Sequence, residues 1–382
     1  MAKGNTSSKK GIKDLFIQNG SMDITFLFFV VVLLLIGLMM LFSASYAYAE
    51  TNYGNSYKFI TQQALFAAVG FALMLLISRI DYHYYMRISW LVYIVAVALL
   101  LLVYVMPATE GYHRWIYIGS FGFQPSEIAK FAIVLLFSHL ISINYTAVRT
   151  FKFSILFLGG LLAIVCALVV FETHLSATIL IFLIGAILLV CGGLKWQWIA
   201  GGAGLGVGAV GLMVVSGVAE YWGDRFQYWR DPWADATGKG YQTIQSLLSI
   251  GSGGVFGRGI GQSMQKYLWV PEPHNDFIFA IVCEELGLIG ALVIIGLFCA
   301  LLWRGFKIAM RAADKFGALL TIGLVCQVGL QALLNILVVT NTIPNTGISL
   351  PFFSYGGTAI VILLCEMGVV LSVSRYSSVN KG

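Results

Sequence analysis

The stretch that decides the fold is Ile24-Thr-Phe-Leu-Phe-Phe-Val-Val-Val-Leu-Leu-Leu-Ile-Gly-Leu-Met-Met-Leu-Phe-Ser-Ala-Ser-Tyr46, which no charged residue interrupts. A helix needs about 20 mostly apolar residues to cross the ~30 Å hydrocarbon core of a bilayer, so this stretch predicts a membrane span. A polar, basic tail precedes this stretch. The apolar run of the stretch is longer than the hydrophobic core of a signal peptide. We therefore expect an uncleaved first span.

The same pattern recurs along the chain. Of 382 residues, 59% are hydrophobic and only 10% are charged, with a mean hydropathy of +0.87. Soluble domains carry roughly 25% charged residues, so this chain has too few to cover a water-facing surface. We predict an all-α polytopic membrane protein of about ten transmembrane helices, namely residues 24–46, 59–78, 88–106, 125–142, 153–171, 175–194, 197–218, 277–303, 317–340 and 357–374.

The distribution of Lys and Arg predicts the orientation. Basic residues are concentrated in the tail at 1–23, in every second short loop and in the tail at 375–382, whereas the short loops of the other side hold only Lys58 and Arg114. By the positive-inside rule, both termini are cytoplasmic, and the ten-helix domain covers 24–374. The net charge of +6 is scattered between apolar runs, which argues against a nucleic-acid surface.

The longest polar segment, residues 219–275, is predicted to be an extracytoplasmic loop between helices 7 and 8. Loops beyond about 15 residues are usually functional or disordered, and this one is rich in Trp, Tyr and Phe, which suits the headgroup level of a membrane. Within it, Tyr241, Ile244 and Leu248 share one helical face, which predicts a short interfacial helix over 241–250.

Three other sets of residues have predicted packing roles. All six cysteines lie in apolar runs without metal-ligand spacing, so we interpret them as small buried hydrophobic residues. The glycines of segment 197–218 favour close helix packing, and the polar stripe of Gln327, Gln331 and Asn335 favours contacts between helices. The glycine-dense stretch 251–261 predicts a flexible loop whose backbone approaches a lipid headgroup.

The strongest local signal is Pro271-Glu-Pro-His-Asn-Asp276, at the junction of the long loop with the eighth span. Glu272, His274 and Asp276 are expected to cluster there. In one interpretation Asn275 or Asp276 caps the helix. In the other, a carboxylate is held where a lipid headgroup can reach it and acts as a general base, kept ionised by the helix N-terminus. Both remain open at the level of the sequence pattern.

Acidic residues also fall inside the eighth span. Glu284 and Glu285 are costly in a membrane and indicate a function or a partner. At least one of them is expected to meet a cation or a backbone donor within the bundle. Proton relay and structural pairing are both compatible with the pattern.

A second cluster contains Arg114, Glu127 and Lys130. Glu127 and Lys130 are three residues apart and can pair on one helical face, which is also the structural alternative to a site. Arg114 and Lys130 together suit an anionic phosphate ester. In the long loop, Arg225, Arg258 and Lys266 supply further positive charge for a headgroup.

Several motifs together resemble the SEDS family of bacterial shape, division and sporulation proteins (RodA, FtsW and SpoVE). They occur in family order from the first span to the last, and Gly261–Lys266 is closest to the FtsW/SpoVE branch. The motifs are Leu41-Phe-Ser-Ala-Ser45, Arg114-Trp-Ile, Gln124-Pro-Ser-Glu-x-x-Lys130, Gly240-Tyr-Gln-x-x-Gln-Ser246, Pro271-Glu-Pro-His-Asn-Asp-Phe-Ile-Phe-Ala280, Glu284-Glu-Leu-Gly287 and Leu350-Pro-Phe-Phe-Ser-Tyr-Gly-Gly357.

The resemblance implies a peptidoglycan glycosyltransferase that polymerises lipid II on the outer face of the cytoplasmic membrane, with Asp276 essential. It also implies a class B penicillin-binding protein, a transpeptidase, as partner among other divisome or elongasome proteins. The chain departs from the family at Asn275, where Thr is frequent, at His174, where Asp is frequent, and at Thr346, where some relatives carry Lys.

For this chemistry we assign the base to Asp276, with Glu272 orienting the acceptor or holding a divalent ion. Substrate-binding candidates are Arg114, Lys130, Arg225, Arg258, Lys266, His274 and Glu127. Mg²⁺ or Mn²⁺ suits a pyrophosphate leaving group beside carboxylates, and no organic cofactor is expected. Two other functions are compatible with the sequence, a lipid II flippase with Glu284, Glu285, Glu366 and Lys130 along its path, and a non-catalytic scaffold for the transpeptidase.

Overall fold

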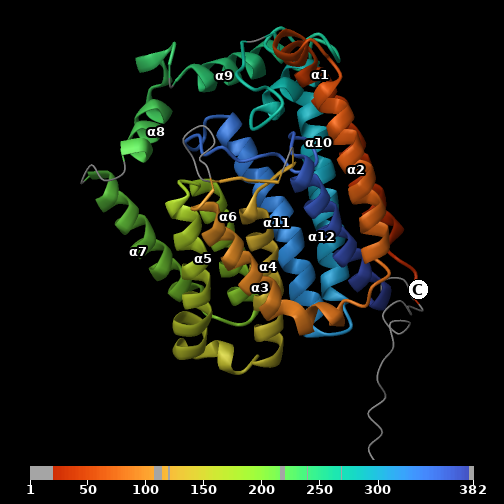
Figure 1. Ribbon diagram of the computed structural model, residues 1–382, viewed down its shortest axis with the longest axis vertical. Coiled ribbons are helices and arrows are strands. Elements are labelled where there is room, and N and C mark those ends of the chain that lie inside the picture. The colour runs from red at the N-terminus through yellow and green to blue at the C-terminus, as the bar shows by residue number, and fades with distance from the viewer. Residues whose placement is uncertain are drawn as a thin grey trace, which may run out of the picture.

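The structure, a computed structural model, describes residues 20–106, 114–118, 121–215, 220–238, 240–267 and 269–377. Most of the predicted basic tail therefore lies outside the described residues. The described part is almost wholly helical (Figure 1). Its long helices are α1 (Ile24–Tyr53), α2 (Lys58–Ile77), α3 (His83–Val103), α4 (Pro125–Ile143), α5 (Gly159–Phe171), α6 (Leu175–Cys191), α7 (Trp196–Val215), α10 (Ile278–Met310), α11 (Lys315–Val339) and α12 (Gly357–Tyr376).

Each predicted span coincides with one of these helices, and α5 is extended at its start by a π-helical stretch, η3 (Lys152–Leu158). Among the described residues, eight helices are long and apolar enough to cross a membrane, counting η3 and α5 as one, and α6 is a shorter apolar helix. The helical membrane architecture is thus confirmed, whereas the count of ten stays a prediction. A small hairpin pairs β1 (Ile116–Ile118) with β2 (Phe121–Phe123), with Ile116 opposite Phe123.

The helices divide into a central and a peripheral set. Of the apolar windows, 67% of α4, 61% of α12 and 56% of α11 is buried, against 22% of α2 and 28% of α3. The central helices are therefore surrounded by protein, and the others present apolar side chains outward, as helices in a lipid solvent do. All six cysteines are free, but Cys191 and Cys299 are exposed on helix surfaces, so the expectation that every cysteine is buried is wrong.

Helix α7 stands away from the bundle (Figure 1). No atom lies within 4 Å of a Cβ built on any of its glycines Gly201, Gly202, Gly204, Gly206, Gly208 and Gly211. The prediction that these glycines allow close helix packing is therefore wrong. Between the lower parts of α6 and α7 lies an apolar groove with an empty volume of about 690 Å³, lined by residues such as Ile187, Val190 and Trp196.

Helix α10 is broken at Gly287, whose φ of 67° and ψ of −170° are not helical. The chain at 254–259 fills the break: the amides of Arg258 and Gly259 donate to the carbonyls of Glu284 and Glu285, both at 3.0 Å, and Leu288 N donates to Gly254 O at 3.0 Å. A Cβ on Gly257 would lie 2.3 Å from Glu285 O, so only glycine allows this approach. The stretch 251–261 is therefore packed against α10, and the prediction that it is flexible is wrong, whereas its approach to a headgroup stays a prediction.

The predicted long loop is itself mostly folded. It contains α8 (Glu220–Arg230), the 3-10 turn η4 (Pro232–Asp235) and α9 (Tyr241–Gly253); in Figure 1, α9 lies at the top and α8 to the upper left of the bundle. The helix predicted over 241–250 is confirmed, and its serines pack against the bundle. Leu248 is 47% exposed, whereas Ser246 and Ser249 are buried and donate to Val339 O at 2.9 Å and Ala280 O at 3.0 Å.

Candidate functional site

The junction before α10 is built by backbone contacts, not by a helix cap. Helix α10 begins at Ile278 with Phe277 in the N-cap position and no side-chain cap. Asn275 instead donates its Nδ2 to Glu272 Oε2 at 2.9 Å. The capping interpretation of Asn275 and Asp276 is therefore wrong. Among the described residues, no hydrogen bond engages the Asp276 carboxylate, which remains available to a substrate.

Asn335 of α11 fixes the backbone of Asp276. Its Nδ2 donates to the carbonyl oxygens of Asp276 and Ile348, each at 2.7 Å, and Asn335 is fully buried. The polar stripe of α11 thus does join separate segments, as predicted. The sequence gives no sign that one of its members holds the candidate base.

The segment Asn345–Gly347 connects the site residues to one another. The Asn345 carbonyl accepts a hydrogen bond from Arg225 Nη1 of α8. The carbonyls of Thr346 and Gly347 accept from Ser176 Oγ of α6. Gly347 has a φ of +67°, and a Cβ there would lie 3.2 Å from Asp276 Oδ2. This segment therefore brings α6, α8 and the start of α10 together, and sequence reasoning did not identify it.

The electrostatics of Asp276 differ from the sequence expectation. Burial and the negative charge of Glu272 raise the pKa of Asp276 to about 6, and the positive charges of Arg225 and Arg114 lower it, so that all three side chains act on this carboxylate. The helix N-terminus was expected to keep the carboxylate ionised, but burial is the larger effect. A carboxylate with a pKa near the working pH is well suited to act as a general base.

Arg114 lies beside the turn between α5 and α6. Its Nε donates to Glu172 O at 3.2 Å, and its Nη2 donates to Thr173 O at 2.7 Å and Thr173 Oγ1 at 3.1 Å. Thr173 has a φ of 59°, so these bonds hold a strained turn. Burial raises the pKa of Glu172 to about 8, although the charge of Arg114 opposes this. The structure thus places Arg114 near Asp276 but uses its guanidinium to shape the turn.

The predicted pair of Glu127 and Lys130 forms at 2.7 Å, and Lys130 also donates to Gln331 Oε1 at 3.0 Å. Lys130 is only 2% exposed. Glu127 and Gln331 line a small cavity together with Glu366. The pair therefore organises the interior beneath the outer face.

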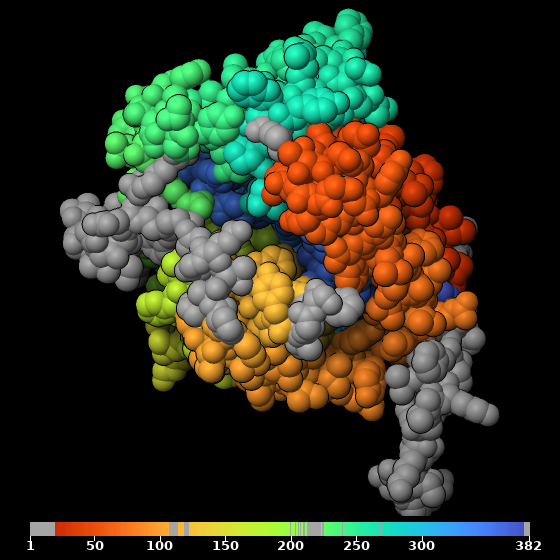
Figure 2. Space-filling model, turned by 45° about the horizontal axis from the view of Figure 1, so that its top comes forward, coloured from red at the N-terminus to blue at the C-terminus, as the bar shows by residue number. Residues whose placement is uncertain are grey.

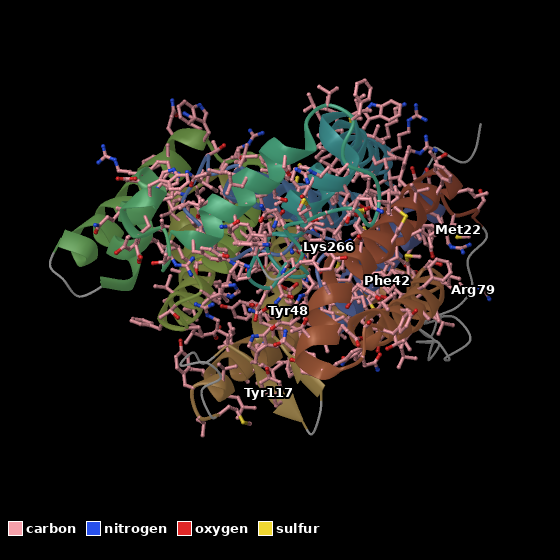
Figure 3. The ribbon with its side chains drawn as sticks, turned by 90° about the horizontal axis from the view of Figure 1, so that it is seen from above. Met22, Phe42, Tyr48, Arg79, Tyr117 and Lys266 are labelled. Carbon is pink, nitrogen blue, oxygen red and sulfur yellow. The ribbon has the colours of Figure 1, made fainter. Side chains whose placement is uncertain are left out.

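Two candidates, His274 and Lys266, are held in structural contacts. His274 is buried, with its ring 4.3 Å from that of Phe59 and 5.0 Å from that of Tyr48, and its carbonyl accepts from Tyr355 N at 2.8 Å. Burial also lowers the pKa of His274 to about 4, which keeps it neutral. Lys266 reaches from the outer segment toward α1 (Figure 3) and is 3% exposed.

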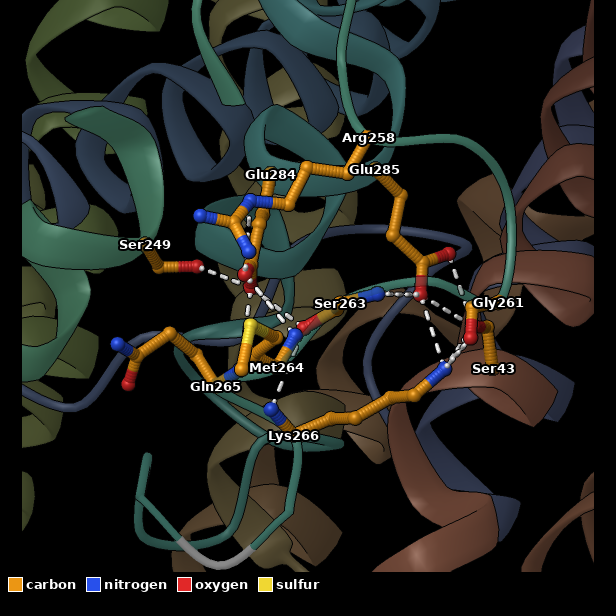
Figure 4. A network of polar contacts seen from close by, with 10 residues as sticks. All are labelled: Ser43, Ser249, Arg258, Gly261, Ser263, Met264, Gln265, Lys266, Glu284 and Glu285. Atoms are coloured by element: carbon orange, nitrogen blue, oxygen red, sulfur yellow. Dashed lines mark hydrogen bonds and ion pairs between the residues drawn. The ribbon is translucent and has the colours of Figure 1, made fainter. Parts of the chain in front are cut away.

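A buried network accounts for Lys266, Arg258 and both glutamates of α10 (Figure 4). Lys266 Nζ lies 3.1 Å from Glu285 Oε1, and Ser43 Oγ donates to the same carboxylate at 2.6 Å. Glu284 accepts from Met264 N at 3.0 Å and Ser249 Oγ at 3.2 Å, and Arg258 Nε lies 3.9 Å from it. The expected cation and backbone donors are thus present, and the geometry favours structural pairing. Lys266 is enclosed by this network, which favours a structural role for it, whereas the Arg258 side chain is 38% exposed and Arg258 stays a predicted headgroup ligand.

Among the described residues, no group of three or more His, Cys, Asp or Glu side chains is arranged to hold a metal ion. Glu272 and Asp276 nevertheless fit the requirement of Mg²⁺, which commonly takes one or two carboxylates and completes its shell with substrate phosphates. Figure 2 shows the outer face hollowed between α1–α2 and the α8–α9 segment, with the chain around α11 and α12 visible at the bottom.

The fold and the site define a class: a multi-pass membrane protein with a carboxylate at one end of its helix bundle that feels the positive charges of two arginines and has no hydrogen bond among the described residues. The family model described as "Cell cycle protein", which covers FtsW, RodA and SpoVE, matches residues 24–379. The chain belongs to this family.

Individual relatives are similar in sequence to this chain over nearly its whole length. The chain is 37% identical over 363 residues to "Stage V sporulation protein E" of Bacillus subtilis (strain 168), covering 94% of this chain and 98% of the relative. It is 35% identical to a "Probable peptidoglycan glycosyltransferase FtsW" of Geobacter sp. (strain M18), covering 92% of this chain and 96% of the relative.

Two solved structures show the same fold. One, described as "Structural coordination of polymerization and crosslinking by a peptidoglycan synthase complex", matches with a TM-score of 0.77 at 25% identity, over 93% of this chain and 98% of that one. The rod shape determining protein RodA of Thermus thermophilus matches with a TM-score of 0.68 at 24% identity, over 93% and 98%.

Proposed function

We propose that this protein is a peptidoglycan glycosyltransferase that polymerises lipid II on the outer face of the cytoplasmic membrane. The observation that carries the proposal is the Asp276 carboxylate, which is unbonded, has a pKa raised to about 6 and lies within the influence of Arg114 and Arg225. A base, an anion site and a membrane-embedded fold are the three parts that this reaction needs.

In the proposed step, an acceptor sugar hydroxyl attacks the anomeric carbon of a donor sugar. The new bond forms from the hydroxyl oxygen to that carbon, and the bond from the carbon to the pyrophosphate oxygen breaks. Asp276 accepts the hydroxyl proton, and undecaprenyl pyrophosphate leaves with the bonding electron pair. Positive charge from Arg114 and Arg225 stabilises the leaving group.

Glu272 orients the acceptor or shares a divalent cation with Asp276. Mg²⁺ or Mn²⁺ bound there would neutralise charge on the pyrophosphate. The influence of Glu272 on the pKa of Asp276 supports this pairing, because it shows that the two negative charges interact. Glu272 itself is exposed and can reach a soluble ion.

The polyprenyl tail of lipid II needs an apolar path from the site. Helix α6 begins beside the site, where Ser176 contacts Thr346, and its far end lines the apolar groove against α7. We propose that the tail follows α6 into this groove.

Relatives and structural neighbours support a partner of the class B transpeptidase type, because one matched structure is a peptidoglycan synthase complex. The exposed apolar surfaces of α10 and α11 and the α8–α9 segment are the proposed contacts. The names of the relatives favour a role in division at the septum or in sporulation.

The test is polymerisation of labelled lipid II by purified protein with its transpeptidase partner, in detergent, where no leaflet gradient exists. Wild type should form glycan polymer, and Asp276→Ala and Asp276→Asn should not. Asp81→Asn is the matched control, because Asp81 is a partly exposed carboxylate at the opposite end of the bundle, where it pairs with His83. Polymer made by Asp276→Asn would refute the assignment of the base.

The same experiment addresses the flippase and scaffold alternatives. The residues of the alternative flippase path fall into two groups in the structure. Lys266 and its neighbours fix Glu284 and Glu285, and Lys130 and Glu366 lie beside the small cavity. Absence of polymer together with lipid II scrambling in vesicles would favour the flippase. Absence of both activities would favour the scaffold.

A further inference from the structure

The turn between α5 and α6 carries a histidine that the proposed mechanism has not used. Arg114 holds the two residues before it through their carbonyls and the Thr173 hydroxyl. Helix α6 then starts at Leu175, so His174 lies directly before its first turn. The guanidinium of Arg114 thus fixes where the His174 ring is placed.

The hydrogen bonding of the ring identifies its tautomer. Gln124 Nε2 lies 3.1 Å from His174 Nδ1. An amide nitrogen can only donate, so Nδ1 is the acceptor and the ring proton is on Nε2. Nε2 is on the opposite edge of the ring, directed away from Gln124. The side chain is partly exposed, which leaves this N–H accessible to a ligand.

The surroundings of the ring are strongly positive. Burial, together with the charges of Arg114, Lys130 and Arg225, lowers the pKa of His174 to about 3, so the ring stays neutral at working pH. Arg114 and Arg225 also act on Asp276. Two residues after His174, Ser176 binds the backbone at Thr346 and Gly347, which lies against the Asp276 carboxylate.

Resting on the proposed function, we propose that the Nε2–H of His174 donates a hydrogen bond to a phosphate oxygen of the pyrophosphate group of the donor, while Arg114 acts on that group mainly by positioning the turn. A neutral donor among cations suits this task because it adds a directional bond without adding to their mutual repulsion. A hydrogen bond to a charged partner contributes enough to change affinity by about tenfold or more.

Two isosteric variants separate this role from a structural one. In His174→Gln the amide nitrogen reaches the position of Nε2, whereas in His174→Asn it reaches only the position of Nδ1, beside Gln124. Inorganic pyrophosphate is the probe. Its affinity is measured from the shift that it causes in the thermal unfolding of the purified protein, and its inhibition constant is measured in lipid II polymerisation.

We expect His174→Asn and His174→Leu to weaken pyrophosphate binding about tenfold and to lower kcat/KM, with His174→Gln retaining most of both. Wild-type pyrophosphate affinity in His174→Asn and His174→Leu, in protein that unfolds at the wild-type temperature, would overturn the inference. A loss in His174→Gln with none in His174→Asn would also overturn it and assign the ring to the Gln124 contact. If wild type forms no polymer, the proposed function fails, and the unfolding shift still decides whether His174 binds pyrophosphate.

Discussion

Replacing Asp276 by asparagine should make the protein both inactive and more stable. The pKa of this carboxyl is raised from 3.8 to about 6 in the folded protein, mainly by burial. The folded state therefore binds the proton more tightly than the unfolded chain, and stability falls as the pH rises from about 4 to about 6. Above that range the ionised carboxylate destabilises the fold by a constant amount, which asparagine would remove.

The magnitude follows from the shift. Roughly two pKa units at 1.36 kcal/mol each give a gain of about 3 kcal/mol for Asp276→Asn at pH 7.5, as an upper limit for a partly exposed group. At pH 5 the gain should be about half as large, because Asp276 is then mostly protonated in the folded state. An acid whose pKa is raised by folding makes the protein less stable as the pH rises. An acid stabilised by a salt bridge has the opposite effect.

The assay is thermal unfolding of purified wild type and Asp276→Asn in detergent at pH 7.5 and pH 5, alongside lipid II polymerisation. The Asp81→Asn variant serves again as control, since Asp81 is outside the site. The reasoning would be refuted if Asp276→Asn were no more stable than wild type at pH 7.5, or if its advantage did not shrink at pH 5.

Four further outcomes are expected. Polymerisation should fall about tenfold for each pH unit below about 6, as Asp276 takes up its proton, and a flat pH profile would contradict its role as base. Asn335→Leu should lose about 2–3 kcal/mol of stability and most activity, because two carbonyls lose their donor; unfolding and polymerisation assays check both. Lys266→Met should cost about 3–5 kcal/mol by leaving the Glu285 charge uncompensated, and adding Glu285→Gln should recover part of the loss in the melting temperature. Gly257→Ala should cost about 2 kcal/mol or more, because its Cβ would meet Glu285 O at 2.3 Å, and an unchanged melting temperature would argue against the packed glycine segment.

Local features of the sequence were sufficient to predict the helices. The length of an apolar run is set by the bilayer, so spans such as 125–142 and 357–374 agree with α4 and α12 to within two residues. The start of the apolar run after Asp276 likewise predicts that this residue lies at a junction before α10. The pairing of Glu127 with Lys130 followed from helical spacing alone.

The remaining features depend on contacts between distant segments, which composition and spacing do not encode. Lys266 looks like a headgroup ligand until the fold places Glu285 beside it. The segment Asn345–Gly347 likewise has no site-like pattern in the sequence. It becomes part of the site because side chains of α6 and α8 donate hydrogen bonds to its carbonyls. His174 departs from the frequent family residue, so the family pattern gives it no role, and only its surroundings do.

The break in α10 also has a consequence for the order in which the chain is made. Gly257 lies thirty positions before Gly287. The ribosome therefore synthesises the segment 254–259 before it synthesises the helix whose break this segment fills. When residues 284–289 are synthesised, the segment 254–259 that pairs with their free amides and carbonyls is already present. A membrane penalises unpaired backbone groups by several kcal/mol each. If the segment came after α10 in the sequence, these groups would be unpaired when the helix enters the membrane.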